Sequence, residues 1–570
     1  MVEKVFVREY LESLKEDAEL DYIFVFLLEA MGFKIVRTTK GSRGQSQYGK
    51  DIVAVKNDEK GITHRWFFEL KGYDDRDIDQ RTYMKPDGIR DSLIEAKDAD
   101  FTYNGIPNFN QLPKKVVLVH NGIIKTNIEK TFNGFIEQNF GEEEFERWDI
   151  YRLTDLFGQY LFGEYLLTDQ DNIKLLKRTL IFLTEPEYEF NDLHILIHRV
   201  INRYKQKPNQ RELVKLLATS NLLAVLIWHY SKETNNLHPA KYAIYLLVLQ
   251  TWSFILSEKA QKKKKYLEAF NKLLDNQLRF LNEYFQKTLP VARTSKGLFT
   301  TVGFSFEPIG YRLRAFQYLD DLIYFFSMSN ASLHDLNELR VYENRQKEEI
   351  KLLVENNWEA LTCPIMDNQL IPIVHLFSFF SACQEISDYD GQFLMRYLVK
   401  CLDQICIRHK TKNVLPLLGT EIEPLINLEI NGERPSDYSD GSSLLINVLL
   451  ELTAIFNLEW LYVHCREVFK DLVNLQVLYP LADLEQLEIS LFSKSLDHEY
   501  YAETSILLPV SFEDFKVKTR NKDRNPVVLK TNDTGYGFLK ILAQSFYRSE
   551  PFPFEWRQLF DRINVQIINH

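Results

Sequence analysis

The sequence Gly49-Lys50-Asp51-Ile52-Val53-Ala54-Val55 is followed, one turn-like segment later, by Trp66-Phe67-Phe68-Glu69-Leu70-Lys71-Gly72. Both stretches are rich in aromatic and β-branched residues, which favour extended strands. The turn-like residues 57–61 predict that the two strands pair antiparallel, with Asp51 and Glu69 at the same end of a sheet. Because side chains alternate along a strand, Glu69 and Lys71 share one face while Leu70 points to the other.

Two carboxylates at one end of a sheet form a site for a hard divalent cation. Mg²⁺ prefers oxygen ligands and keeps several waters, so Asp51 and Glu69 suffice to hold it with a substrate phosphate, and Mn²⁺ takes similar ligands. A cation there acidifies a water molecule and stabilises charge that develops on a phosphate. Lys71 can orient or help deprotonate that water and can offset phosphate charge. The pattern therefore predicts hydrolysis of a phosphodiester.

The segments around this pair predict an α/β domain that extends to about residue 165, because helical periodicity alternates there with strand-like runs. The expected helices are residues 9–31, which Gly32 ends, and residues 91–99, 128–139 and 154–166. The expected strands are residues 33–39, 51–56, 64–71, 115–120 and 148–153.

Asp51, the Glu69-Leu70-Lys71 triplet and the order of these elements resemble the PD-(D/E)XK nuclease superfamily, the fold of restriction endonucleases, and its Mrr-like defence members most of all. The resemblance covers about residues 10–165. It implies that Asp51, Glu69 and Lys71 are catalytic and that the two acids hold Mg²⁺ or Mn²⁺. An acid on the first helix often completes the site in that superfamily, which implies a role for Glu29. Several Mrr-like proteins carry glutamine where this chain has Glu69, and their later Gln-x-x-x-Lys signature has no convincing counterpart here.

A basic strip precedes Asp51, since Lys34, Arg37, Lys40, Arg43 and Lys50 lie in a segment without acids. We assign Lys40, Arg43, Gln45 and Lys50 to nucleic-acid contact, although a solvated surface loop explains them equally well. Residues 1–165 as a whole hold 23 lysines and arginines against 30 aspartates and glutamates, a net charge of −7. Such a domain should hold DNA weakly, so we expect the helical region or an oligomer to supply the grip.

The remainder of the chain is dominated by long amphipathic segments and predicts a large helical region. We expect one helical domain over residues 170–412 and another over 443–570, which form one unit or two around the loop-rich break at 413–442. Strand signals are few and lie near residues 506–518 and 527–530. Lys262–Lys265 is a four-lysine run at the start of a helix, read either as a solvated face or as a nucleic-acid contact.

Composition favours a reduced, cytoplasmic protein. The five cysteines are sparse and odd in number, and the first residues lack the plan of a secretion signal. We expect no membrane span, because the longest apolar candidate, residues 221–229, is too short. Cys401, Cys406 and His409 invite a zinc interpretation, but a position in a helical core is favoured. The sequence has no P-loop motif, so an ATPase would have to be a separate partner.

The leading hypothesis is a metal-dependent endonuclease that cuts DNA, acting as an effector of a bacterial anti-phage or restriction system. The helical region would sense, oligomerise or dock a partner, by analogy with such effectors. RNA, including transfer RNA, is a further substrate to consider, since the chemistry does not distinguish the sugars. The alternative from another class is a scaffold in which the nuclease fold binds without catalysis, and the net charge of −11 fits that interpretation.

Overall fold

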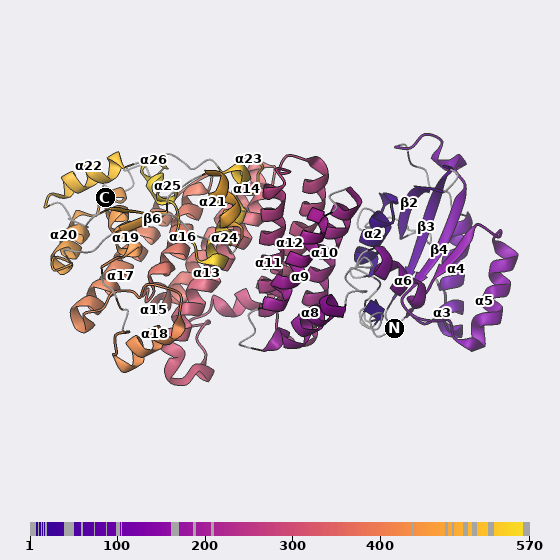
Figure 1. Ribbon diagram of the computed structural model, residues 1–570, viewed down its shortest axis with the longest axis horizontal. Helices are drawn as coiled ribbons and strands as arrows, with labels where there is room; N and C mark the ends of the chain where they lie inside the picture. Colours follow the sequence, from indigo (N-terminus) through magenta and orange to yellow (C-terminus); the bar gives the residue numbers. More distant parts are fainter. Residues whose placement is uncertain are drawn as a thin grey trace. The chain divides into compact units, whose positions relative to one another are not determined.

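A computed structural model of the chain divides it into two compact units, Met1–Leu247 and Val248–His570 (Figure 1). The described residues are 7–8, 11–12, 14, 16, 20–38, 51–58, 61–72, 75–86, 88–98, 103, 105–160, 170–185, 190–206, 210–435, 438, 441–472, 477–480, 484–493, 500–503, 510–522 and 529–562. The first unit contains a five-stranded mixed sheet, and the remainder is largely helical, which confirms the predicted two-part architecture at that level.

The sheet has its strands in chain order: β1 (Lys34–Arg37), β2 (Ile52–Asn57), β3 (Thr63–Lys71), β4 (Lys114–His120) and β5 (Phe145–Trp148). The first three strands pair antiparallel, and β3, β4 and β5 pair parallel. The parallel connections pass through α3 (Gln80–Met84) and α4 (Ile89–Asp98), and then through α5 (Thr126–Asn139). The carboxyl ends of β3 and β4 therefore meet at one edge, which is also the edge where β2 begins.

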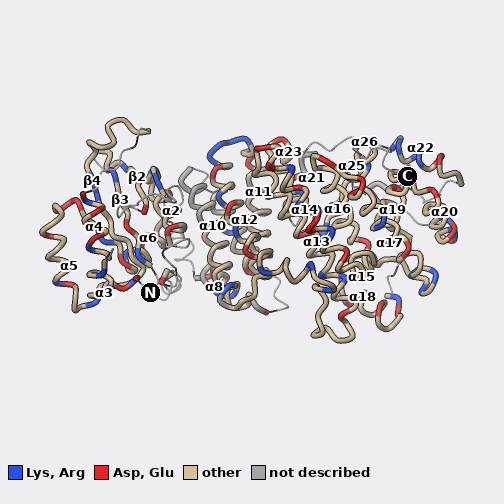
Figure 2. The backbone as a smooth tube through the Cα atoms, turned by 180° about the vertical axis from the view of Figure 1, so that it is seen from behind, with Lys and Arg blue, Asp and Glu red and all other residues tan. Residues whose placement is uncertain are grey.

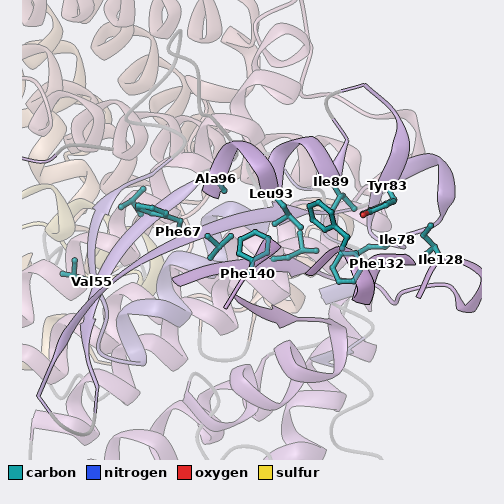
Figure 3. Packing of buried hydrophobic residues seen from close by; sticks show 14 of the residues in the cluster. Val55, Phe67, Ile78, Tyr83, Ile89, Leu93, Ala96, Ile128, Phe132 and Phe140 are labelled. Atoms are coloured by element: carbon teal, nitrogen blue, oxygen red, sulfur yellow. The ribbon is translucent and has the colours of Figure 1, made fainter. Parts of the chain in front are cut away.

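Both faces of the sheet are covered, because side chains alternate between two apolar layers. One layer packs Phe67 of β3 against the residues of α3, α4 and α5 (Figure 3). The other packs Phe68 against Phe24 and Trp148, at ring-centroid distances of 5.4 and 5.5 Å. Phe24 lies on α2 (Asp21–Ala30), which contacts α6 (Ile150–Tyr160).

The last strand was predicted at residues 148–153, and that position is wrong. The strand β5 ends at Trp148, and α6 begins at Ile150. The reason is Asp149, whose carboxylate accepts a hydrogen bond from the Arg152 N–H at 3.0 Å. An aspartate in this position caps a helix and so ends the strand before it.

The helical part of the first unit comprises α8 (Gln170–Ile181), α9 (Asn191–Gln206), α10 (Gln210–Glu233) and the start of α11 (His238–Ser257). The helix α11 corrects the expectation that no segment could span a membrane. It is 20 residues long and apolar enough to do so by length and composition, and it is the one such helix among the described residues. Within the protein, 89% of its apolar window is buried, as in the core helix of a folded domain.

The second unit is built from helices. The longer ones are α12 (Lys264–Ala292), α13 (Glu307–Ala331), α14 (Leu336–Asn356), α16 (Leu370–Ala382), α17 (Asp388–Lys412), α19 (Leu444–Ile455), α20 (Glu459–Val468), α21 (Leu484–Leu491), α22 (Phe512–Asn521) and α24 (Phe538–Tyr547). The shorter ones are α15 (Trp358–Leu361), α18 (Ile422–Ile426), α23 (Lys530–Asp533), α25 (Pro553–Arg557) and α26 (Leu559–Arg562), with the 3₁₀ turn η6 at Thr301–Phe306.

The described strands of the second unit lie outside the two segments, 506–518 and 527–530, for which the sequence suggested strands; residues 506–509 and 527–528 of those segments lie outside the described residues. The described strands β6 (Val477–Pro480) and β7 (Tyr500–Glu503) form an antiparallel pair. The strand expected up to residue 518 is instead the helix α22 over its described part, residues 510–518. Ser511 accepts a hydrogen bond from the Asp514 N–H and caps the helix, and Phe512, Phe515 and Thr519 are buried at helical spacing.

Candidate active site

Asp51 lies immediately before β2, and the backbone holds it at the end of the β2–β3 pair. Its N–H donates to the Phe68 carbonyl at 2.9 Å, and its Oδ2 accepts from the Leu70 N–H at 2.8 Å. Since Ile52 pairs with Phe68 in this antiparallel ladder, Asp51 stands opposite Glu69. The hairpin therefore brings the two acids together, as the spacing predicted.

Glu69 and Lys71 share the face of β3 that also carries Phe67. Glu69 is buried, at 3% of its full exposure, and its Oε1 lies 2.8 Å from Lys71 Nζ. The same ammonium lies 3.3 Å from Oε1 of Glu16. One lysine thus serves three carboxylates, those of Glu69, Glu16 and, more remotely, Asp51.

Among the described residues, Lys71 is the cation next to these carboxylates, and the electrostatics of the site follow from that arrangement. Burial, and next the charge of Glu69, raise the pKa of Asp51 from 3.8 to about 8, against the opposing pull of Lys71. Burial lowers the pKa of Lys71, but Glu69, Glu16 and Asp51 together raise it well above its ordinary value. Lys71 therefore stays protonated at neutral pH, while Asp51 is poised to exchange a proton.

The donor set fits a hard cation held by two carboxylates. No described residue bonds to Asp51 Oδ1 or to Glu69 Oε2, so each acid keeps one oxygen available. A divalent ion between them would replace the missing positive charge and is consistent with the raised pKa of Asp51. Among the described residues, no three His, Cys, Asp or Glu side chains gather as a metal-holding group. Water and a substrate phosphate would have to supply the remaining ligands, as Mg²⁺ commonly accepts.

The further residues assigned from the sequence have different outcomes. Glu29 is half-buried on α2, and its role in completing the site stays a prediction. A further acid, Glu16, lies 3.3 Å from Lys71 Nζ. No sequence signal singled out Glu16, because the expected first helix carries several acids. Lys40, Arg43, Gln45 and Lys50 lie outside the described residues, so their role in nucleic-acid contact stays a prediction.

Three acids that follow Lys71, namely Asp75, Asp77 and Asp79, belong to the local structure. Asp75 pairs with Lys85 at 2.5 Å, and Asp77 pairs with Lys125 at 2.8 Å. Asp79 caps α3 by accepting from the Thr82 N–H at 2.8 Å. These contacts explain the acids without a second metal site.

His120, which sequence reasoning missed, is the β4 residue in register with Lys71. Its ring is fully buried, its Nδ1 lies 3.0 Å from the Arg76 carbonyl oxygen, and burial lowers its pKa to about 4. A neutral imidazole at this edge adds no positive charge to the site.

Cys401 and Cys406 are buried in α17, as expected for core thiols. Cys406 Sγ lies 3.8 Å from Cys465 Sγ, which belongs to α20. These contacts give the zinc interpretation no support.

No protein-family model, curated protein or solved structure matches this chain.

Proposed function

We propose that the chain is a metal-dependent endonuclease that hydrolyses phosphodiester bonds of DNA. One observation carries the proposal. Two buried acids from adjacent strands, Asp51 and Glu69, face each other at a sheet edge with one shared lysine, Lys71. A fold that needed only stability would neutralise or remove such a pair, since uncompensated buried charge is costly.

The three side chains would divide the work as follows. Asp51 and Glu69 would hold Mg²⁺ or Mn²⁺ through the oxygens that no described residue engages. When bound, the ion supplies an acidified water and an electrophile for the phosphate. Lys71, which stays protonated, would orient the attacking water and offset charge on the phosphate. Its raised pKa favours these roles over that of a general base.

The covered faces of the sheet favour the same location for the chemistry. Apolar layers occupy both sides of β3, so a substrate can approach these acids at the strand ends. Residues 39–50 lie outside the described residues; they include the predicted nucleic-acid contacts and directly precede Asp51 in the sequence. The sequence resemblance to PD-(D/E)XK nucleases, which rests on the same Asp51, Glu69 and Lys71, also supports the proposal, and with it a role as a defence effector.

The test is cleavage of supercoiled plasmid by the full chain with Mg²⁺ or Mn²⁺, alongside single-stranded and transfer RNA. We expect wild type to cut, and Asp51→Asn, Glu69→Gln and Lys71→Met each to lose at least about 100-fold, as when a residue acting in the transition state is removed. Asp79→Asn is the matched control, because asparagine caps a helix as well as aspartate. Equal cutting by wild type and all variants would refute the assignment of the active site. Cutting of RNA but not of plasmid would show that the substrate is RNA.

A second candidate is a binding protein that retains the fold without catalysis. The ion pair between Glu69 and Lys71 favours it, because the ammonium already balances one carboxylate charge that a metal would otherwise balance. Calorimetric titration with Mn²⁺ separates the two functions. Binding by wild type that is lost in Asp51→Asn supports the enzyme, and no binding by either supports the second candidate.

A further inference from the structure

The turn between α11 and α12 concentrates positive charge on an otherwise acidic protein. Five of the seven residues from Lys259 to Lys265 are lysines, and all five are exposed. Figure 2 shows Lys262–Lys265 as an unbroken blue stretch of the tube. We call the five residues Lys259 and Lys262–Lys265 the lysine turn.

The lysine turn is scarcely neutralised within the protein. Lys264 lies 3.7 Å from Glu268, in a pair whose side chains are 88% and 60% exposed. Lys263 lies 5.6 Å from the ring centroid of Tyr266. No acid of the described chain forms an ion pair with Lys259, Lys262, Lys263 or Lys265. Most of this charge is therefore open to an external anion.

The lysines also work against the local structure. Lys263 is the N-cap of α12 and makes no side-chain capping bond, and the first turn of the helix has no acid. Positive side chains at this end oppose the helix dipole, and a serine or aspartate cap would be more stable. Residues that conflict with local stability are expected where function requires them.

Lys259, the first residue of the lysine turn, shows the same conflict with local stability. Lys259 has a φ of +49°, a left-handed conformation at the end of α11 that glycine or asparagine adopts more readily. Its N–H donates to the Leu256 carbonyl, and the Ala260 N–H donates to the Ile255 carbonyl, which closes the helix. Ala260 is fully buried beneath the turn, and its carbonyl accepts from the Lys263 N–H at 2.9 Å. The backbone that presents the lysines is thus ordered before any ligand binds, which limits the entropy lost on binding.

We propose that the lysine turn binds the phosphate backbone of nucleic acid and supplies affinity that the acidic sheet domain lacks. The choice of nucleic acid as the ligand rests on the proposed nuclease function. That the turn binds an anion follows from its charge and geometry and is independent of that function. Lysines act as point charges on flexible stems, which suits phosphates of any sequence. The N-terminal residues 1–165 carry a net charge of −7, so a grip elsewhere on the chain is required for tight binding.

The test is fluorescence anisotropy of labelled DNA and RNA duplexes with the full chain in EDTA, where no metal supports cleavage. The test variant combines Lys262→Gln, Lys263→Gln and Lys265→Gln. The control combines Lys470→Gln, Lys518→Gln and Arg520→Gln, three exposed cations of the same unit whose loss changes the net charge equally. We expect about 10-fold weaker binding in the test variant and less than about twofold in the control. The slope of log Kd against log salt should fall by about 2 to 3 in the test variant alone.

Equal weakening in both variants would overturn the proposal, as would a wild type that binds neither duplex. Preference for vesicles of phosphatidylserine over both duplexes would also overturn it. The plasmid assay with Mg²⁺ separates this result from the nuclease proposal. If binding depends on the lysine turn but no cleavage occurs, the binding surface is supported and the nuclease proposal is refuted. If cleavage occurs but both variants bind equally, the nuclease proposal is supported and the binding surface is refuted.

Discussion

Asp51 in the first unit and Glu451 in the second are both buried acids, yet their pKa values move in opposite directions. Glu451, on α19, is fully buried and accepts from Arg557 Nε at 2.8 Å, Trp556 Nε1 at 2.7 Å and Lys522 Nζ at 2.9 Å. Burial alone would raise its pKa, but these partners lower it to about 2. Asp51 has one backbone donor and a second carboxylate opposite, and its pKa rises.

The comparison teaches that burial does not by itself mark a functional acid. Asp390 repeats the pattern of Glu451, since Lys347 and Lys351 lie 2.8 and 2.5 Å from its carboxylate and lower its pKa to about 2. Buried acids in the helical unit with such partners are parts of the structure. An acid left short of partners beside another acid is a candidate for chemistry.

Removing Glu451, the buried acid with several donors, should have the largest effect on stability. In Glu451→Gln, Arg557 and Lys522 lose a carboxylate that lies 2.8 and 2.9 Å from their nitrogens, and Arg557 is 2% exposed. We expect the free energy of unfolding to fall by about 3–5 kcal/mol, the usual cost of breaking a buried ion pair. Calorimetry of thermal unfolding measures it. Glu467→Gln, which removes an exposed pair with Lys470, is the control, and a loss no larger than in that control would contradict the expectation.

Removing Asp51, the buried acid with one backbone donor, should change the free energy of unfolding in the opposite direction. Asp51→Asn keeps an acceptor for the Leu70 N–H and removes the repulsion with Glu69. Without metal at about pH 8.5 we expect the free energy of unfolding to rise by about 1–2 kcal/mol, as when strained active-site charges are neutralised. Addition of Mn²⁺ should stabilise wild type but not the variant. If Asp51→Asn is less stable than wild type and unfolds at lower denaturant concentration, Asp51 is a structural residue like Glu451, and the expected difference between the two acids is contradicted.

The pH dependence of wild type offers a finer test. Because the pKa of Asp51 rises from 3.8 unfolded to about 8 folded, the native state binds the extra proton between these values. Stability contributed by this group is therefore lost as pH rises from about 4 to about 8. A divalent ion competes with that proton, so its stabilisation should grow over the same range. Melting temperatures with and without Mn²⁺ at several pH values test this, and a metal effect independent of pH would contradict it.

The sequence predicted the sheet and its charged end because both rest on local patterns. Strands β2, β3 and β4 begin or end within a residue or two of the expected positions, since their apolar runs are bounded by turn residues. Strand alternation then placed Glu69 and Lys71 on one face. The pairing of Asp51 with Glu69 followed from the short hairpin, which leaves few alternative registers.

Contacts between distant segments could not be predicted in this way. Glu16 reaches Lys71 across 55 residues of sequence, and nothing in its neighbourhood distinguishes it from nearby acids. The segment 506–518 suggested a strand, but in its described part the cap at Ser511 and the buried helical spacing produce α22. Capping bonds and tertiary burial decide such segments, and a charge pattern on the exposed side does not.

Asp367 supplies the smallest and sharpest test, because its pKa is also raised although it lies in the helical unit. Burial raises the pKa of Asp367 to about 6, against hydrogen bonds from Ser443 Oγ at 2.5 Å and the Leu444 N–H at 3.1 Å. These donors mark it as a cap of α19, and among the described residues no lysine or arginine pairs with it. Since asparagine caps nearly as well, Asp367→Asn should change the free energy of unfolding by about 0.5 kcal/mol or less and leave DNA cleavage unchanged. Loss of cleavage comparable to that of Asp51→Asn would show that a raised pKa alone, without the shared lysine, identifies the functional acids.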